Sequence, residues 1–330
     1  MMKKLALAVL ATATVGTTQA ATVCVFDLLG ASGESYQQMK EWALAAKSWG
    51  TDVTLKAYTD ERVANEDFKA GKCDGVTITA MRGREYNKFA GSIDSIGGVP
   101  DNKVAQSAIS FALNARNAAK MISANKRYEI AGIAPMGAAY LFVNDRNINT
   151  VAKAAGKKIA VLDYDQAQKI MVQQIGAQPV SSDVTNFASK FNNGQVDIIG
   201  APAYAYKPLE LQKGIGTKGA MVNFPVVHIT GQVIINPAKF AEGFGQKSRD
   251  FFVKQLPKAF ASIAKLESAI PASSKMEVPV GDREGYQKMM RESRIALTKQ
   301  GIYDKEMMAI LKKARCSVDK TNFECSLAGE

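Results

Sequence analysis

Two arginines, Arg82 and Arg84, follow directly after a β-rich run at 73–79. An arginine at the end of a buried strand can hold a carboxylate or phosphate through paired hydrogen bonds, because the guanidinium presents its N–H donors in a fixed fork. Each arginine could equally form a surface salt bridge. We therefore treat both as candidate ligand-binding residues.

Serines and aspartates follow other predicted strands. Ser32 and Ser35 stand where a helix is expected to begin, so their hydroxyls could meet a ligand or only cap that helix. Asp163 and Asp165 follow a strand-like run and could pair with a cationic group of a ligand. Helix capping explains Asp165 equally well.

Tyrosine supplies apolar area with a polar tip, which suits the wall of a binding cleft. Tyr140, Tyr164 and Tyr204 lie at or near the ends of predicted strands, as does Tyr206. Ordinary packing is the alternative for each of them.

No catalytic or metal-binding pattern is present. His228 is the single histidine, and we expect it to be an ordinary strand residue. There is no Gly-x-Ser-x-Gly elbow and no Cys-x-x-Cys pair, and the glycine pattern at 91–97 lacks the lysine of a phosphate loop. We expect no enzyme activity, no catalytic residue, no metal and no cofactor.

The four cysteines are Cys24, Cys73, Cys316 and Cys325. An even count in an oxidising compartment predicts two disulfides. Cys316 and Cys325 lie close in sequence and would close a small loop. Cys24 and Cys73 each begin a predicted strand, so they can pair if those strands are neighbours.

The first twenty residues have the order of a secretory signal peptide: two lysines, an apolar run, and small residues ending at Ala20. The apolar run is shorter than the roughly 20 residues that cross a bilayer, and no later stretch comes close. We predict cleavage after Ala20 and a periplasmic mature chain that does not span the membrane. A lipid anchor on Cys24 is the alternative, but Ala-Thr-Val before it is a poor lipoprotein signal.

The composition predicts a globular chain without a nucleic-acid partner. The 330 residues are 47% hydrophobic and 22% charged, with length enough for two domains. The net charge is +11, but the basic residues are scattered and form no dense block with interleaved aromatics. The excess charge predicts either a solvated basic surface or a field that favours anionic ligands or membranes.

Strand and helix patterns alternate along the first 80 residues. The pattern gives strands at 22–28, 52–58 and 73–79 and helices at 34–49 and 61–70. Such crossover units build a parallel sheet with helices on its faces, and the first strand commonly lies between the second and third. That order would place Cys24 beside Cys73.

A second α/β unit follows. Its strands are expected at 158–164, 176–181 and 196–200, and its helices at 165–175 and 183–191, capped by Asp165 and Asp183. Strand-like runs at 128–135, 138–144 and 228–236 would connect the two units. Helices are expected at 103–123, 237–270 with an interruption at Pro257, 285–300 and 304–314.

These elements predict an α/β fold with two lobes, mixed sheets of mainly parallel type and C-terminal helices. We expect lobe I at 21–138 plus about 233–270, lobe II at 139–232, and the C-terminal helices of 271–330 packing across both. Ligands bind such sheets at the carboxyl ends of their strands. This interpretation requires two halves that face each other across an opening, and we expect neither one continuous sheet nor halves without an opening.

The segment 154–202 resembles the corresponding stretch of TRAP-type, DctP-like periplasmic solute-binding proteins, which have a type II two-lobed fold. The matching residues are Gly176, Ala177, Pro179, Val180, Gly194, Val196, Asp197 and Pro202. The run 229–240 is similar to the return strand of that family. The whole chain is also similar to a group of exported proteins sometimes labelled as RND-type aminoglycoside efflux components. That label fits poorly, because such a pump needs many membrane helices.

One position departs from the resemblance. The family places a carboxylate-binding arginine on the strand after Lys-x-Ile, and Ala160 stands there in this chain. Arg82 or Arg84 could compensate, or the ligand class could differ.

The resemblance implies a periplasmic protein that captures a small molecule between two lobes by hinge motion, with an anion among the candidate ligands. It would deliver this ligand to an inner-membrane transporter or an envelope complex. A non-catalytic accessory protein of an efflux or envelope complex is the first alternative, and a periplasmic enzyme the second.

Overall fold

The computed structural model describes residues 20–330, so the predicted signal peptide lies outside the described residues apart from Ala20. Nine strands form one mixed sheet in the order β2-β1-β3-β8-β4-β7-β5-β6, with β9 beside β8. The strands are β1 (Ala21–Phe26), β2 (Val53–Tyr58), β3 (Gly75–Thr79), β4 (Glu129–Val143), β5 (Lys158–Leu162), β6 (Gln178–Ser182), β7 (Ile198–Pro202), β8 (Ala220–Ile235) and β9 (Lys275–Met276).

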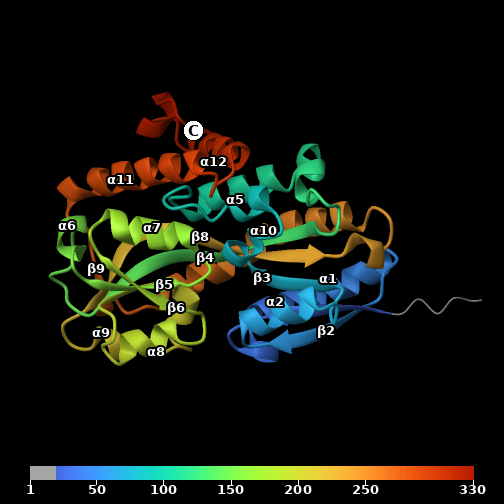
Figure 1. The fold of residues 1–330 in the computed structure, drawn as a ribbon, viewed down its shortest axis with the longest axis horizontal. Coiled ribbons are helices and arrows are strands. Elements are labelled where there is room, and N and C mark those ends of the chain that lie inside the picture. Colours follow the sequence, from blue (N-terminus) through green and yellow to red (C-terminus); the bar gives the residue numbers. More distant parts are fainter. Residues whose placement is uncertain (1–19) are drawn as a thin grey trace, which may run out of the picture.

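Helices cover the sheet, and the last two helices of the chain lie outside the other elements (Figure 1). They are α1 (Glu34–Ser48), α2 (Glu61–Lys69), α3 (Ala80–Gly83), α4 (Lys88–Gly91), α5 (Asn102–Ala112), α6 (Val151–Ala154), α7 (Gln166–Gln174), α8 (Phe187–Asn192), α9 (Gln212–Ile215), α10 (Phe244–Ser268), α11 (Val280–Lys299) and α12 (Lys305–Val318).

The first three strands have the predicted order, because β1 pairs in parallel with both β2 and β3. This order brings Cys24 of β1 next to Cys73, just before β3. The two cysteines form a disulfide with their Cα atoms 5.9 Å apart, and Cys316 and Cys325 form the second. Both predicted disulfides are confirmed.

The two longest strands, β4 and β8, run through both halves of the molecule. They pair antiparallel from Glu129 opposite Ile235 to Val143 opposite Ala220. The runs expected at 128–135 and 138–144 are therefore one strand, and the run expected to start at 228 starts at Ala220. The long ladder has register shifts, one of them between Pro135 and Gly137, where Gly137 has a φ of +106° that favours glycine.

The sheet is continuous, but the hydrophobic cores are separate. One core gathers β1, β3, α1, α5 and α10, whereas two smaller cores lie around β5, β7, α8 and the distal ends of β4 and β8. The expectation of separate sheets was wrong, because β4 and β8 run through both halves and join them in one sheet. Ala167 of α7 also packs into the first core. We call the part around the first core lobe I and the part around the other two lobe II; the boundaries of the lobes stay predictions.

Three helical expectations were wrong. Helix α10 runs through Pro257 without a break, because Phe252, Leu256 and Phe260 bury one continuous face of it. Helix α8 begins only at Phe187, since the Asp183 carboxylate accepts hydrogen bonds from Thr185 instead of capping a helix. The helix expected at 103–123 ends at Ala112 and continues as a 3₁₀ turn, Ala115–Met121.

Helices α11 and α12 lie across one side of the molecule (Figure 1). Along α11, Tyr286 belongs to a lobe II core, whereas Met290 and Leu297 belong to the lobe I core. Helix α12 packs on α5. The C-terminal helices therefore contact both lobes.

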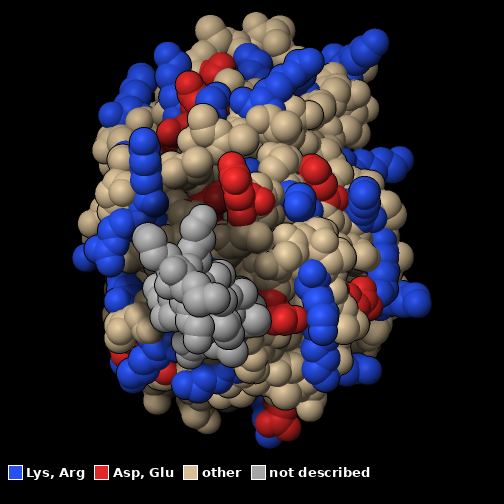
Figure 2. All heavy atoms as spheres, turned by 90° about the vertical axis from the view of Figure 1, so that its right-hand side faces the viewer, with Lys and Arg blue, Asp and Glu red and all other residues tan. Residues whose placement is uncertain are grey.

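Between residues 20 and 330, no helix has both the length and the apolar character that crossing a bilayer requires. Figure 2 views the molecule from the right-hand side of Figure 1, where basic side chains are spread over the visible face with acidic side chains between them. On this face they do not gather into one basic patch.

Candidate functional site

A cavity of about 140 Å³ lies between the lobes. Lobe I contributes Leu28 and Met81, lobe II contributes Ala160 and Phe187, and the long strand β8 contributes Val226. Most of the remaining wall is also apolar. Its polar side chains are Thr79, Asp94, Asp165, Gln168, Tyr204 and Tyr303.

A larger groove of about 460 Å³ lies next to this cavity. It is bounded by the start of α1, one side of α10 and the segment 203–208. Leu28 and Tyr204 line both spaces, so these two side chains form the partition between the inner cavity and what we call the outer groove.

Arg82 does not line the cavity. Its Nε donates to Glu61 Oε2 at 3.0 Å, and its guanidinium lies 3.7 Å from the centre of the Tyr164 ring. Burial alone lowers the pKa of Arg82, but the Glu61 carboxylate outweighs burial and raises it. The Glu61 side chain is fully buried, so this guanidinium is committed to its carboxylate.

Tyr164 joins the same cluster from lobe II. Its hydroxyl donates to Glu61 Oε2 at 2.8 Å, and the backbone N–H of Thr79 donates to Glu61 Oε1 at 2.7 Å. Burial raises the pKa of the Tyr164 hydroxyl, which keeps it a hydrogen-bond donor. The Tyr164–Glu61 bond links the two lobes.

Arg84 makes a second link between the lobes. Its Nη1 donates to Asp165 Oδ1 at 3.0 Å, while Nε and Nη2 donate to the Gly91 carbonyl at 3.3 and 3.2 Å. The guanidinium also lies 5.1 Å from the centre of the Tyr303 ring. We refer to the Arg84–Asp165 pair and the Tyr164–Glu61 bond as the interlobe contacts.

Asp165 and Asp163 have different surroundings. Asp165 caps α7 by accepting from the Ala167 N–H at 3.1 Å, as expected, and it also lines the cavity. Asp163 is exposed and lines neither the cavity nor the outer groove.

Ser35 reaches the outer groove, and Ser32 is exposed and lines neither space. The residue that organises this turn is Asp27, whose carboxylate accepts from the N–H groups of Leu29, Ser35 and Tyr36. Gly33 is required here, because a Cβ at that position would lie 1.7 Å from Asp27 Oδ1. The sequence offered Asp27 only as part of a β-rich run.

The candidate tyrosines lie in different parts of the structure. Tyr140 lines neither space, and its hydroxyl donates to Glu267 Oε1 at 3.3 Å. Tyr204 lies in the partition, and its hydroxyl has no hydrogen-bond partner among residues 20–330. Burial raises the pKa of Tyr204, so this free hydroxyl stays neutral and can donate or accept.

Asp94 and Tyr303 are two of the polar cavity residues that were missed from the sequence, and Gln168 is another. Asp94 is buried, and its carboxylate accepts from the Thr230 N–H at 2.9 Å and from the Thr230 hydroxyl at 2.7 Å. Burial raises its pKa to about 7, against the effect of these bonds. Tyr303, between α11 and α12, accepts from the Ile96 N–H at 3.4 Å. Neither stands near a predicted strand end.

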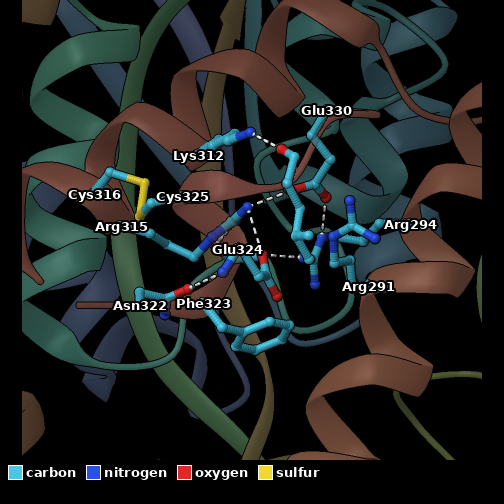
Figure 3. A network of polar contacts seen from close by, with 12 residues as sticks. Arg291, Arg294, Lys312, Arg315, Cys316, Asn322, Phe323, Glu324, Cys325 and Glu330 are labelled. Atoms are coloured by element: carbon cyan, nitrogen blue, oxygen red, sulfur yellow. Dashed lines mark hydrogen bonds and ion pairs between the residues drawn. A yellow bond between two sulfur atoms is a disulfide. The ribbon is translucent and has the colours of Figure 1, made fainter. Parts of the chain in front are cut away.

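A buried ionic cluster supports the cavity wall from the C-terminal side (Figure 3). Its side chains are Arg294, Arg315, Glu324 and Glu330, which we call the C-terminal network. The two arginines also donate to the carbonyls of Ile96 and Gly98 at 3.0 and 2.7 Å. This loop carries Ile96 and Asp94 into the cavity wall.

Comparison with known proteins shows the family of this chain. A family model for solute-binding protein AdeT 1/2 matches residues 38–330. An Acinetobacter baumannii protein named "Probable solute-binding protein AdeT1" is 52% identical over 306 residues, covering 93% of this chain and 100% of that relative. The chain belongs to the AdeT 1/2 family of solute-binding proteins.

Solved structures show the fold of this AdeT 1/2 family member. A TRAP periplasmic solute-binding protein from Desulfovibrio salexigens, with bound orotic acid, has a TM-score of 0.74 at 16% identity, covering 91% of this chain and 99% of that chain. One from Haemophilus influenzae, with bound L-gulonate, has a TM-score of 0.73 at 10% identity, covering 89% and 99%. The predicted two-lobed periplasmic-binding-protein fold is confirmed.

Proposed function

We propose that this AdeT 1/2 family member is a periplasmic receptor that encloses a small solute in the inner cavity and delivers it to a membrane transporter. The carrying observation is that both lobes and the shared strand β8 build the cavity wall, while the interlobe contacts hold the lobes together around it. Opening of those contacts would widen the cavity for entry and release of a ligand, which fits hinge closure.

Export to the periplasm is part of this proposal. The family, the two disulfides and the signal-like residues 1–20 support it, because disulfides persist in oxidising compartments. The resemblance places an anion among the candidate ligands, and the two similar structures named above hold orotic acid and L-gulonate.

A thermal-shift panel on the mature protein tests the function. The panel contains acids, sugars, amines, metal chelates and small aromatic alcohols. A ligand at 100 times its Kd stabilises the folded state by about 2.7 kcal/mol, which is a shift of several degrees in Tm. No shift with any compound would contradict solute binding and would favour an accessory role in an envelope complex. Turnover of a bound compound would favour an enzyme instead.

A matched pair of glycine variants locates the binding. Gly200 lines the cavity, and a Cβ added there meets no atom within 4 Å, so Gly200→Leu fills the cavity without a backbone clash. Gly285 is an exposed residue of α11 where an added Cβ also meets nothing, so Gly285→Leu is the control. We expect Gly200→Leu to abolish the shift and Gly285→Leu to retain it. Retention in both would place the ligand elsewhere.

A further inference from the structure

The wall of the inner cavity carries no positive charge. Among the described residues, no lysine, arginine or histidine lines it, and Ala160 stands where the sequence resemblance places a ligand-binding arginine. A carboxylate entering an apolar cavity loses its hydration, and this loss is compensated only where a cation or several donors replace the water.

Neither neighbouring arginine is free to supply that cation. Arg82 is paired with fully buried Glu61, and Arg84 is paired with Asp165, which is only 3% exposed. If either guanidinium turned toward a ligand, it would leave a buried carboxylate without its partner. Such a rearrangement only exchanges one unpaired anion for another.

The charged groups that do line the cavity are acidic. Asp94 and Asp165 are both buried, and both belong to the wall. Asp94 already accepts two hydrogen bonds from Thr230, and Asp165 is paired with Arg84. The charge of Asp165 is balanced by Arg84, and Asp94 contributes only negative charge when it is ionised, so the wall holds no unbalanced cation to attract an anionic ligand.

The volume of the cavity and its remaining polar groups narrow the class of ligand further. A cavity of about 140 Å³ is close to the roughly 150 Å³ apolar cavity that holds one benzene molecule. The Tyr204 hydroxyl is unpaired among residues 20–330, and the Tyr303 hydroxyl accepts only one bond, at 3.4 Å. These hydroxyls can bond to one polar group of an otherwise apolar ligand.

We propose that the inner cavity selects a small uncharged molecule with a benzene-sized apolar body and one hydroxyl-like group over a carboxylate of the same size. This inference rests on the proposed solute-binding function. It concerns the ligand class of the same cavity, and it departs from the anion that the resemblance places among the candidate ligands.

Three compounds that each carry one small substituent on a benzene ring test the ligand class: benzyl alcohol, benzoate and benzylamine. Titration calorimetry at pH 7.5 on the mature protein should give a Kd for benzyl alcohol at least tenfold lower than for either charged compound. Benzoate or benzylamine binding as tightly as the alcohol overturns the proposal. If none of the three binds but an acid, sugar, amine or metal chelate of the panel does, the ligand class is wrong and the receptor function stands. If nothing in the panel binds, both fail.

An arginine restored at the departing position gives an independent test. Ala160→Arg should strengthen benzoate binding at least tenfold and weaken benzyl alcohol binding, because it adds a cation to the wall and fills part of it. Ala152→Arg, at an exposed alanine of α6, adds the same charge outside the cavity and should change neither Kd. If Ala160→Arg leaves the preference unchanged, the missing cation does not set the ligand class. The wild-type comparison decides the class even if that variant does not fold.

Discussion

The interlobe contacts and the C-terminal network both bury charged groups, but they differ in what they join. In the C-terminal network, Arg294 and Arg315 meet two carboxylates that follow α12 in the chain, and the Cys316–Cys325 disulfide holds this segment to α12. In the interlobe contacts, each bond has one partner in lobe I and the other in lobe II. The first joins parts of one C-terminal segment and its neighbouring helix, and the second joins parts that would separate in the opening motion proposed above.

Because of this difference, we expect the loss of similar bonds to change the free energy of unfolding in one region and the ligand affinity in the other. Breaking a pair in the C-terminal network leaves a buried charge for as long as the protein is folded, so it lowers the free energy of unfolding. Breaking an interlobe contact can be relieved by opening, where water solvates the charge. Its loss should therefore appear mainly in ligand affinity, because the ligand is held by the closed state.

Glu324→Gln should have the largest effect. The Glu324 carboxylate accepts from Arg294 at 2.7 Å and forms an ion pair with Arg315 at 2.8 Å, and both guanidinium groups are almost fully buried. We expect the free energy of unfolding, measured by urea denaturation, to fall by about 3–5 kcal/mol. Lys288→Met, which breaks an exposed pair with Glu284, is the control and should change it by less than about 0.5 kcal/mol. Equal effects would show that burial does not strengthen the network.

His228 extends the comparison to a buried group with no partner. Neither ring nitrogen has a hydrogen bond in the described structure, the ring stacks on Phe260, and burial lowers its pKa to about 4 from 6.5. As the pH falls from 6.5 to 4, the unfolded chain binds a proton at His228 that the folded chain does not bind. The free energy of unfolding of the wild type should therefore decrease by on the order of 3 kcal/mol relative to that of His228→Phe. Above pH 7 this pH-dependent difference should vanish.

Measuring the difference between these two proteins removes the opposing contribution of Asp94, whose raised pKa weakens the fold as pH rises between about 4 and 7. Parallel curves for wild type and His228→Phe across pH 4–7 would contradict a neutral buried His228.

Asp165→Asn tests whether an interlobe contact behaves differently from an ion pair of the C-terminal network. Asparagine retains the cap of α7 but loses the charge that pairs with Arg84. We expect about tenfold weaker binding of the best panel ligand by calorimetry, with less than about 1 kcal/mol lost from the free energy of unfolding. A loss of 3–5 kcal/mol without a change in affinity would remove the distinction between the two regions.

Tyr164→Phe should have the smallest effect. It deletes the hydroxyl that reaches Glu61 across the lobes, while Arg82 and the Thr79 N–H continue to bond to that carboxylate. A single hydrogen bond of this kind predicts about a two- to fivefold loss of affinity. Tyr140→Phe, which removes a hydroxyl bonded to Glu267 outside both spaces, is the matched control and should leave affinity unchanged. Equal changes in the two variants would contradict a closing role for Tyr164.

The sequence predicts local features of this fold well. The alternation of strands and helices gave the order of β1, β2 and β3, and with it the Cys24–Cys73 disulfide. Asp165 was correctly placed as the cap of α7. These features depend on residues close in sequence or on a general rule for crossover units.

Features that depend on distant partners could not be predicted. Helix α10 passes through Pro257 because the lobe I core buries its face, and β8 begins early because β4 continues beside it. The pairing of Arg84 with Asp165 joins residues 81 positions apart, so no local pattern distinguishes Arg84 from a ligand-binding arginine. Asp94 reaches the cavity on a loop placed by the C-terminal network.

A crystal structure of the protein with the tightest panel compound tests the central claim most directly. The account predicts density for that compound inside the inner cavity, in contact with Tyr204 and Tyr303, with the Arg84–Asp165 pair intact. Density confined to the outer groove, or closed lobes around an inner cavity that holds no compound, would contradict it.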